Sequence, residues 1–208
     1  MSYCKRWMGQ FGLLTRGAAA FASPYGWEQL SGVLRKLEDW GMAVRGFFVK
    51  DITAMQFTTR DTVEQLESAL PADTGKPVLL SAVDPANPYG AWVEWPELPV
   101  VQFARKPGNF LVYEGNALCL WIESFGKHIA VFPGHPAAAQ GQGERLSAIL
   151  AEVFSTLIAR YHLSKITVER WNGRPAAEAS LEQEFRRLGG ELDRTRFIFW
   201  PTALKYRR

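Results

Sequence analysis

The chain has 208 residues and a mass of 23.4 kDa, enough for one or two domains with a buried core. About 47% of its residues are hydrophobic and 22% are charged, which is typical of a globular protein and excludes a disordered or fibrous one. Its two cysteines exclude a disulfide scaffold and favour a reducing, cytoplasmic compartment. No apolar run reaches the roughly 18 residues of a membrane span, so we expect no membrane partner.

The net charge of +3 hides an uneven distribution along the chain. Residues 1–60 contain 8 Lys and Arg against 4 Asp and Glu, residues 61–159 contain 5 against 11, and residues 160–208 contain 11 against 6. Two basic ends therefore surround an acidic middle. The ends could meet the phosphates of a nucleic acid, although such an excess is also typical of an ordinary solvated surface.

The first part of the chain predicts helices followed by a hairpin. Apolar residues recur at helical spacing over 27–40, and a shorter helix is expected over 4–10. Two short strands, 43–49 and 55–57, flank a polar turn, and a further helix is expected over 60–70. This order of elements predicts a winged helix, in which the hairpin is the wing.

A stretch with two prolines and one glycine, 71–77, marks a domain boundary, so we expect domains at 1–75 and 76–208. The second domain is predicted to contain a strand, a three-stranded meander, a long amphipathic helix, a strand, a short helix and a closing strand, at 78–83, 109–132, 146–161, 165–170, 178–188 and 196–200. The predicted fold class is therefore α+β. A winged-helix domain is followed by a mixed domain with an antiparallel β-meander and two packed helices.

Motifs for catalysis and metal binding are missing from the sequence. Neither a Gly-x-x-x-x-Gly-Lys-Ser/Thr loop nor a Gly-x-Gly-x-x-Gly fingerprint occurs, so no nucleotide-phosphate site is expected. Cys119, His128 and His135 have the spacing of no known zinc module, and Cys119 is expected to face inward from a strand. We therefore predict no catalytic residue and no metal ligand.

Two constellations suggest binding instead. The run Arg45–Phe48 puts a cation and two aromatic residues at the start of the predicted wing, where a winged helix usually meets nucleic acid. In the alternative interpretation, the phenylalanines belong to the core and Arg45 is merely exposed.

The second constellation is a proline-rich segment, 84–96. Its prolines restrict the backbone and hold Tyr89, Trp92 and Trp95 at low entropic cost, which suits stacking on nucleobases. Alternatively, these rings fill the joint between the two domains, a role that we expect of Trp92 more than of Trp95.

Several segments, taken in order, resemble the region after the two motor domains of the Lhr (large helicase-related) superfamily 2 helicases. They are Gly12–Arg16, Trp27–Gly41, Arg45–Val49, Gln56–Phe57 and Asp84–Gly90, and the last, Asp-Pro-Ala-Asn-Pro-Tyr-Gly, is the most specific. Because 165–190 is also similar to the end of that helicase core, the resemblance covers nearly the whole chain. Phe11 and Phe47 replace a tyrosine that is frequent in the family, which affects the expected contacts of the wing.

The resemblance implies a winged helix and a family-specific domain that guide the tracking strand of a 3′-to-5′ DNA translocase acting in DNA repair. ATP and Mg²⁺ would bind the motor domains, so no cofactor is expected in this chain. The implied partners are single-stranded DNA or a DNA–RNA hybrid, and motor domains in the same polypeptide. The chain would be a designed fragment of a larger helicase or a free-standing relative. The predicted nucleic-acid-binding residues are Trp95, Arg45, Arg16, Lys50, Tyr89 and Arg105.

Two other functions remain open at this point. A related winged-helix DNA glycosylase would need a group that helps water attack, and Asp84 or Gln56 could serve, although each also fits a purely structural role. A winged helix can also act as a protein-docking module.

Overall fold

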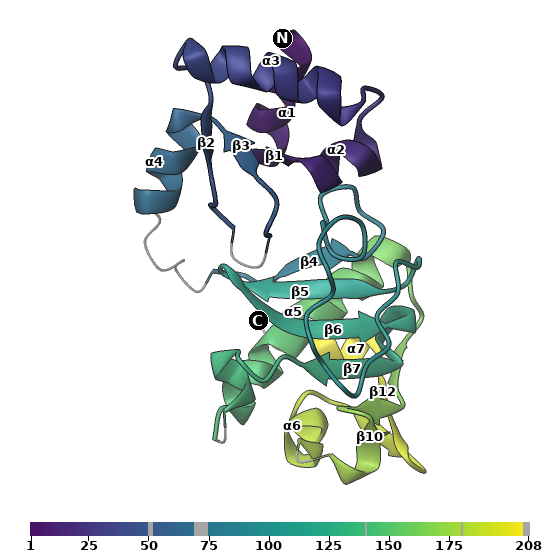
Figure 1. The fold of residues 1–208 in the computed structure, drawn as a ribbon. Coiled ribbons are helices and arrows are strands. Elements are labelled where there is room, and N and C mark those ends of the chain that lie inside the picture. Colours follow the sequence, from purple (N-terminus) through teal and green to yellow (C-terminus); the bar gives the residue numbers. More distant parts are fainter. Residues whose placement is uncertain (50–51, 69–74, 140, 180, 206–208) are drawn as a thin grey trace. The chain divides into compact units, whose positions relative to one another are not determined.

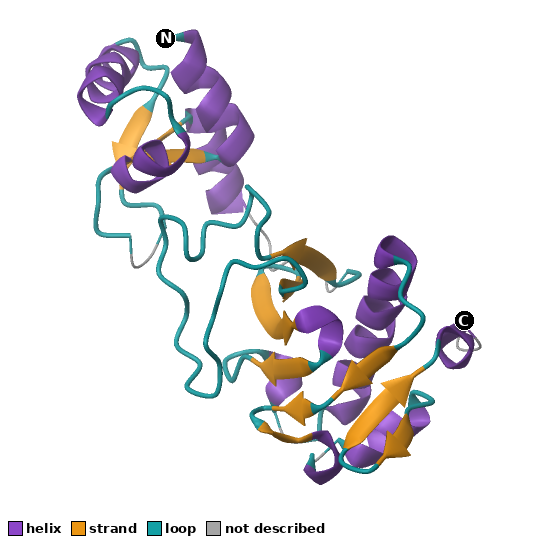
Figure 2. Cartoon of the chain, turned by 90° about the vertical axis from the view of Figure 1, so that its right-hand side faces the viewer, coloured by secondary structure: helices purple, strands orange, loops and turns teal. Residues whose placement is uncertain are grey.

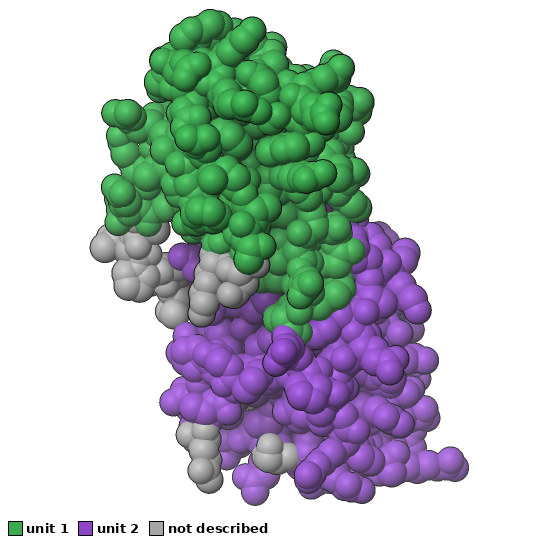
Figure 3. Space-filling model, viewed as in Figure 1, with its two compact units in different colours: residues 1–70, 88–96 green, residues 71–87, 97–208 purple. Residues whose placement is uncertain are grey.

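The computed structural model describes residues 1–49, 52–68, 75–139, 141–179 and 181–205. The chain forms two compact units, residues 1–70 with 88–96 and residues 71–87 with 97–208 (Figure 3). The sequence placed segment 88–96 in the second domain, whereas in the structure it packs with the first unit, where Trp92 contacts the core. In the described part of the chain, no helix is both long and apolar enough to cross a membrane.

The first unit is a winged helix, as predicted (Figure 1). Its elements are α1 (Ser2–Phe11), β1 (Leu13–Thr15), α2 (Arg16–Ala22), α3 (Trp27–Asp39), β2 (Val44–Gly46), β3 (Gln56–Thr58) and α4 (Arg60–Ser68). The strands form an antiparallel sheet in the order β1-β3-β2, and the hairpin between β2 and β3 is the wing.

Local sequence explains the helices of this unit. Helix α3 buries Leu30, Leu34 and Leu37 on one face and is followed by Gly41 at a positive φ of 69°. Helix α2 and strand β1 were not predicted, because three strand residues and an alanine-rich turn give no periodic signal. Helix α2 begins where the Thr15 hydroxyl accepts a hydrogen bond of 3.0 Å from the Ala18 N–H.

The second unit combines two sheets with helices and confirms the α+β class. Its elements are β4 (Val78–Ser81), β5 (Phe110–Glu114), β6 (Ala117–Glu123), β7 (His128–Val131), α5 (Gly143–Tyr161), β8 (Ile166–Val168), β9 (Arg170–Trp171), β10 (Arg174–Pro175), α6 (Glu182–Arg187), β11 (Glu191–Asp193), β12 (Arg196–Phe199) and α7 (Pro201–Lys205), with short 3₁₀ helices at Ser124–Gly126, Pro136–Ala138 and Ala176–Glu178. The larger sheet has the order β10-β9-β7-β6-β5-β4 and the smaller one the order β11-β12-β8.

The predicted meander is confirmed as the antiparallel strands β5, β6 and β7. Strand β4 adds to β5, and β9 pairs in parallel with β7. Helix α5 buries Leu150, Val153, Phe154 and Leu157 in one apolar cluster with the sheet residues, and Phe185 of α6 joins it. Figure 2, in which helices are purple and strands orange, shows helices beside the strands of this unit.

One expectation for the second unit needs correction, and two elements were not expected. The short helix begins at Glu182 rather than 178, because a 3₁₀ turn at Ala176–Glu178 precedes it. Strand β11 and helix α7 were not predicted. Strand β11 follows the glycine pair Gly189–Gly190 and pairs with β12, a contact that local periodicity does not encode.

Candidate nucleic-acid interface

The candidate interface of the winged helix consists of α2, α3 and the wing. The leucine face of α3 points into the core, so its opposite face is exposed and carries Gln29, Arg35 and Lys36, together with Glu28 and Asp39. Sequence reasoning missed Arg35 and Lys36, although the leucine period already places them on the outer face. This face offers two cations next to two carboxylates, a mixed surface rather than a strongly basic one.

The predicted cations of this unit differ in their surroundings. Arg16 is exposed at the first residue of α2. Arg45 is exposed on β2, and its Nε lies 3.2 Å from Oε1 of Glu38, at the end of α3. An exposed ion pair of this kind contributes little to stability, so Arg45 can exchange Glu38 for another anion at low cost. Lys50 lies outside the described residues.

Tyr89 and Trp95 lie together in the first unit. Their rings stack with centroids 6.0 Å apart and planes inclined by 19°. Burial raises the pKa of Tyr89, and both side chains are partly buried. The indole of Trp95 lies over Gly90, which has a φ of 67°, so that a Cβ there would collide with the ring. The binding of bases by these two residues stays a prediction, and the structure adds a packing role.

Arg105 belongs to the second unit and holds a turn. Its guanidinium donates to the main-chain carbonyls of Asn87 at 2.7 Å and Asp84 at 3.2 Å. The Asp84 carboxylate accepts from the Ala86 N–H at 2.8 Å, and the buried Asn87 amide donates to the Ala82 carbonyl at 2.9 Å. Asp84 is thus a turn-capping residue. The contact of Arg105 with nucleic acid stays a prediction.

Gln56 is the residue on which the shape of the wing depends. It is fully buried; its Oε1 accepts from the N–H groups of Phe48 and Val49, and its Nε2 donates to the carbonyls of Val49 and Ile52, all at 2.9–3.1 Å. Its amide therefore fixes the wing, and the structure favours this role over activation of a water molecule.

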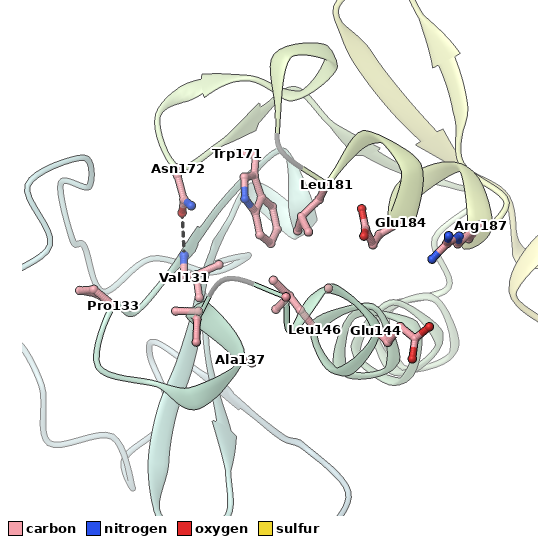
Figure 4. A pocket seen from close by; sticks show the side chains of 14 residues that line it. Val131, Pro133, Ala137, Glu144, Leu146, Trp171, Asn172, Leu181, Glu184 and Arg187 are labelled. Carbon is pink, nitrogen blue, oxygen red and sulfur yellow. Dashed lines mark hydrogen bonds between the residues drawn. The ribbon is translucent and has the colours of Figure 1, made fainter.

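The second unit contains a cavity of about 730 Å³ (Figure 4). Trp171 and Leu146 give it an apolar wall. The Asn172 side chain reaches back and accepts a hydrogen bond of 2.9 Å from the Val131 N–H. The charged side chains that line the cavity are Glu144, Glu184 and Arg187. No sequence motif surrounds these three residues, so the sequence could not predict that they line one cavity.

A partly buried ion pair adjoins this cavity. Glu114 accepts from the Arg145 guanidinium at 2.9 Å and lies 3.2 Å from Nε2 of His135, whose Nδ1 accepts from the N–H of the cavity residue Ala137. Burial lowers the pKa of His135, and the hydrogen bonds fit a neutral ring with its proton on Nε2. Burial, helped by Glu114, raises the pKa of Cys119 to about 12. The inward-facing Cys119 expected from the sequence is confirmed, and its side chain is fully buried.

The element order and the exposed wing define the first unit as a winged-helix domain. Residues 1–78 match the sequence model of a family described as large helicase-related protein, winged-helix domain. Residues 1–78 therefore form a winged-helix domain of the large helicase-related (Lhr) type, which supports a helicase-associated region.

Two relatives support this assignment. A protein of Mycolicibacterium smegmatis named Lhr helicase/probable uracil glycosylase is 32% identical over 184 residues, which are 85% of this chain. A protein of Escherichia coli named Lhr helicase/uracil glycosylase is 26% identical over 195 residues, which are 91% of this chain. The chain spans 12% of the length of either relative.

Proposed function

We propose that the chain is a nucleic-acid-binding region of an Lhr-family protein and guides single-stranded DNA for a 3′-to-5′ translocase active in DNA repair. The observation that carries the proposal is the winged helix itself, with a wing and an outer α3 face that expose Arg45, Arg35 and Lys36. In the proposal, ATP and Mg²⁺ bind motor domains elsewhere in the same polypeptide, in the cytoplasm, and this chain hydrolyses no ATP.

A salt titration tests this proposal. Binding of a fluorescent single-stranded DNA, and of a DNA–RNA hybrid in parallel, is measured by anisotropy at several salt concentrations. Three or four phosphate contacts predict micromolar or weaker binding and a slope of log affinity against log salt of roughly −2 to −3. A slope near zero in the unmodified chain would overturn the proposal and favour protein docking.

Matched variants locate the contact. Arg16→Ala, at the exposed start of α2, should reduce the slope by about 0.7 because one phosphate contact is lost. Arg186→Ala is the control, since Arg186 is exposed on α6 of the second unit and already paired with Glu182 at 2.9 Å. We expect it to leave the slope unchanged.

A second candidate, removal of uracil from DNA, is favoured by the names of both relatives and by the cavity of the second unit. Trp171 would pack against a flipped base and Asn172 would lie at its edge, while Glu144 or Glu184 accepts a proton from the attacking water. Water then bonds to C1′, the glycosidic bond breaks, and its electron pair leaves with the base. The product is an abasic site.

Alkaline cleavage of a uracil-containing strand measures this activity. Glu144→Gln and Glu184→Gln are compared with Glu178→Gln, an exposed carboxylate outside the cavity lining. One of the two cavity variants should lose roughly 100-fold or more of the rate while the control keeps it. Equal rates in all variants, or no abasic product from the unmodified chain, would contradict this candidate.

A further inference from the structure

The wing carries one aromatic side chain, Phe47, that is mostly exposed to solvent. Phe47 is 67% exposed, the largest fraction among the big hydrophobic side chains of the described residues, and Val49 and Met55 beside it are each 39% exposed. Scattered exposed hydrophobic residues are normal, so exposure alone indicates nothing. Whether Phe47 can bind a partner therefore has to be judged from the backbone and the side chains around it.

The backbone after Phe47 is fixed by hydrogen bonds. Strands β2 and β3 pair as far as Gly46 opposite Gln56. Beyond that point the buried Gln56 amide holds the N–H groups of Phe48 and Val49 at 3.0 and 2.9 Å. The main chain is therefore held on both sides of Phe47, and binding orders only its side chain.

The two phenylalanines of the wing differ in their surroundings. The Phe48 ring folds back over Gly46, so closely that a Cβ at Gly46 would lie 2.9 Å from it. Arg45, two residues earlier, is exposed as well. A cation and an exposed aromatic ring thus lie two residues apart on the wing, which fits a phosphate and an adjacent base better than an apolar protein surface.

We propose that Phe47 stacks on the terminal base pair at a junction between duplex and single-stranded DNA and helps to unpair it. Apolar side chains that insert between bases unstack them at a cost of a few kcal/mol per step, which the new stacking contact offsets. Arg45 holds the adjacent phosphate after release from Glu38. The proposal rests on the proposed nucleic-acid binding and names the mode of contact.

A fluorescent base analogue at the junction tests this contact. A duplex with a 3′ single-stranded extension carries 2-aminopurine in its terminal pair, and unpairing increases the fluorescence. The unmodified chain should increase the fluorescence, whereas Phe47→Ala should abolish the increase and weaken binding about 5- to 150-fold. Phe47→Trp should retain both, and the salt slope should stay the same in both variants because no phosphate contact changes.

Trp40→Ala is the matched control, since Trp40 is also an exposed aromatic residue of the first unit, at the end of α3. It should change neither signal. If the unmodified chain binds with the expected salt slope but Phe47→Ala binds as tightly and unpairs as well, stacking by Phe47 is wrong while the proposed function stands. If Phe47→Ala weakens binding to a plain single strand as much as binding to the junction, and the fluorescence increase at the junction persists, unpairing by Phe47 is wrong. If the unmodified chain does not bind DNA, both proposals fail.

Discussion

The two units use their aromatic residues in opposite ways. Among the described residues, every exposed large aromatic side chain belongs to the winged helix, including Tyr25, Trp40 and Phe47. In the described part of the second unit, the large hydrophobic side chains that are exposed are aliphatic, and Phe110, Phe154 and Phe185 are completely buried. Aromatic rings contribute to contacts when exposed and to stability when buried. The difference indicates that the winged helix presents a contact surface, whereas the second unit is organised around its core.

The buried polar groups follow the same division. In the winged helix, the Gln56 amide holds the loop that presents Phe47. In the second unit, Glu114, Arg145 and His135 form a network beside a cavity. Gln56 thus holds the wing in place, and the Glu114 network adjoins the cavity through His135 and Ala137. Substitutions of these groups and of the aromatic residues test the comparison.

The largest effect is expected from Phe154→Ala in α5. The side chain is fully buried and its ring lies 4.9 Å from that of Phe199, so its removal should lower the free energy of unfolding by about 3–5 kcal/mol. Phe47→Ala should cost less than about 0.5 kcal/mol, because an exposed ring adds little packing. Urea denaturation measures both, and similar losses would contradict the division between core and contact aromatics.

Gln56→Leu should cost about 1–3 kcal/mol. It leaves the N–H groups of Phe48 and Val49 and the carbonyls of Val49 and Ile52 without their amide partner. Gln65→Leu, an exposed position on α4, is the control and should stay within about 0.5 kcal/mol. Chemical denaturation of the two variants checks this. A loss no larger than that of the control would remove the support for a rigid wing.

Gly90→Ala should cost about 1 kcal/mol or more. Gly90 has a φ of 67°, and a Cβ there would meet the Trp95 indole. Gly32→Ala is the matched control: its Cβ would meet no atom within 4 Å in helix α3, so alanine should stabilise by roughly 0.5–1 kcal/mol. Thermal melts should therefore shift in opposite directions. A stabilising Gly90→Ala would show that Trp95 is free to leave its place over Gly90.

Strong periodic patterns made much of the fold predictable from the sequence. The leucines of α3 and the apolar stripe of α5 gave helices, and Gly115 and Gly126 marked the turns of the meander. The packing of segment 88–96 was not predictable in this way. It depends on Trp92, whose Cβ lies 3.3 Å from where a Cβ of Gly17 would be, and such contacts over long sequence separation leave no local pattern.

The candidate site was harder to predict than the fold. The sequence left open whether Phe47 belongs to the core, and the structure shows it 67% exposed. The partners of several other residues come from distant segments. Arg105 binds carbonyls 18 and 21 residues away, and the cavity residues Glu144, Trp171 and Glu184 come from three separate elements. Residue types alone could not distinguish a cation that holds a turn from one that is available to a phosphate.

The smallest expected effect is the pH dependence of stability from His135. Burial holds the pKa of this ring below its ordinary value, so the unfolded chain takes up the proton more readily than the folded one. The stability from the neutral ring is complete above the ordinary histidine pKa of about 6.5 and declines as the pH falls toward the lower folded value. His135→Asn keeps an acceptor near the Ala137 N–H but does not titrate, so its melting temperature should depend less on pH between about 7 and 5. Melting curves of the two proteins that run parallel over this range would show that His135 does not couple the Glu114 network of the second unit to pH.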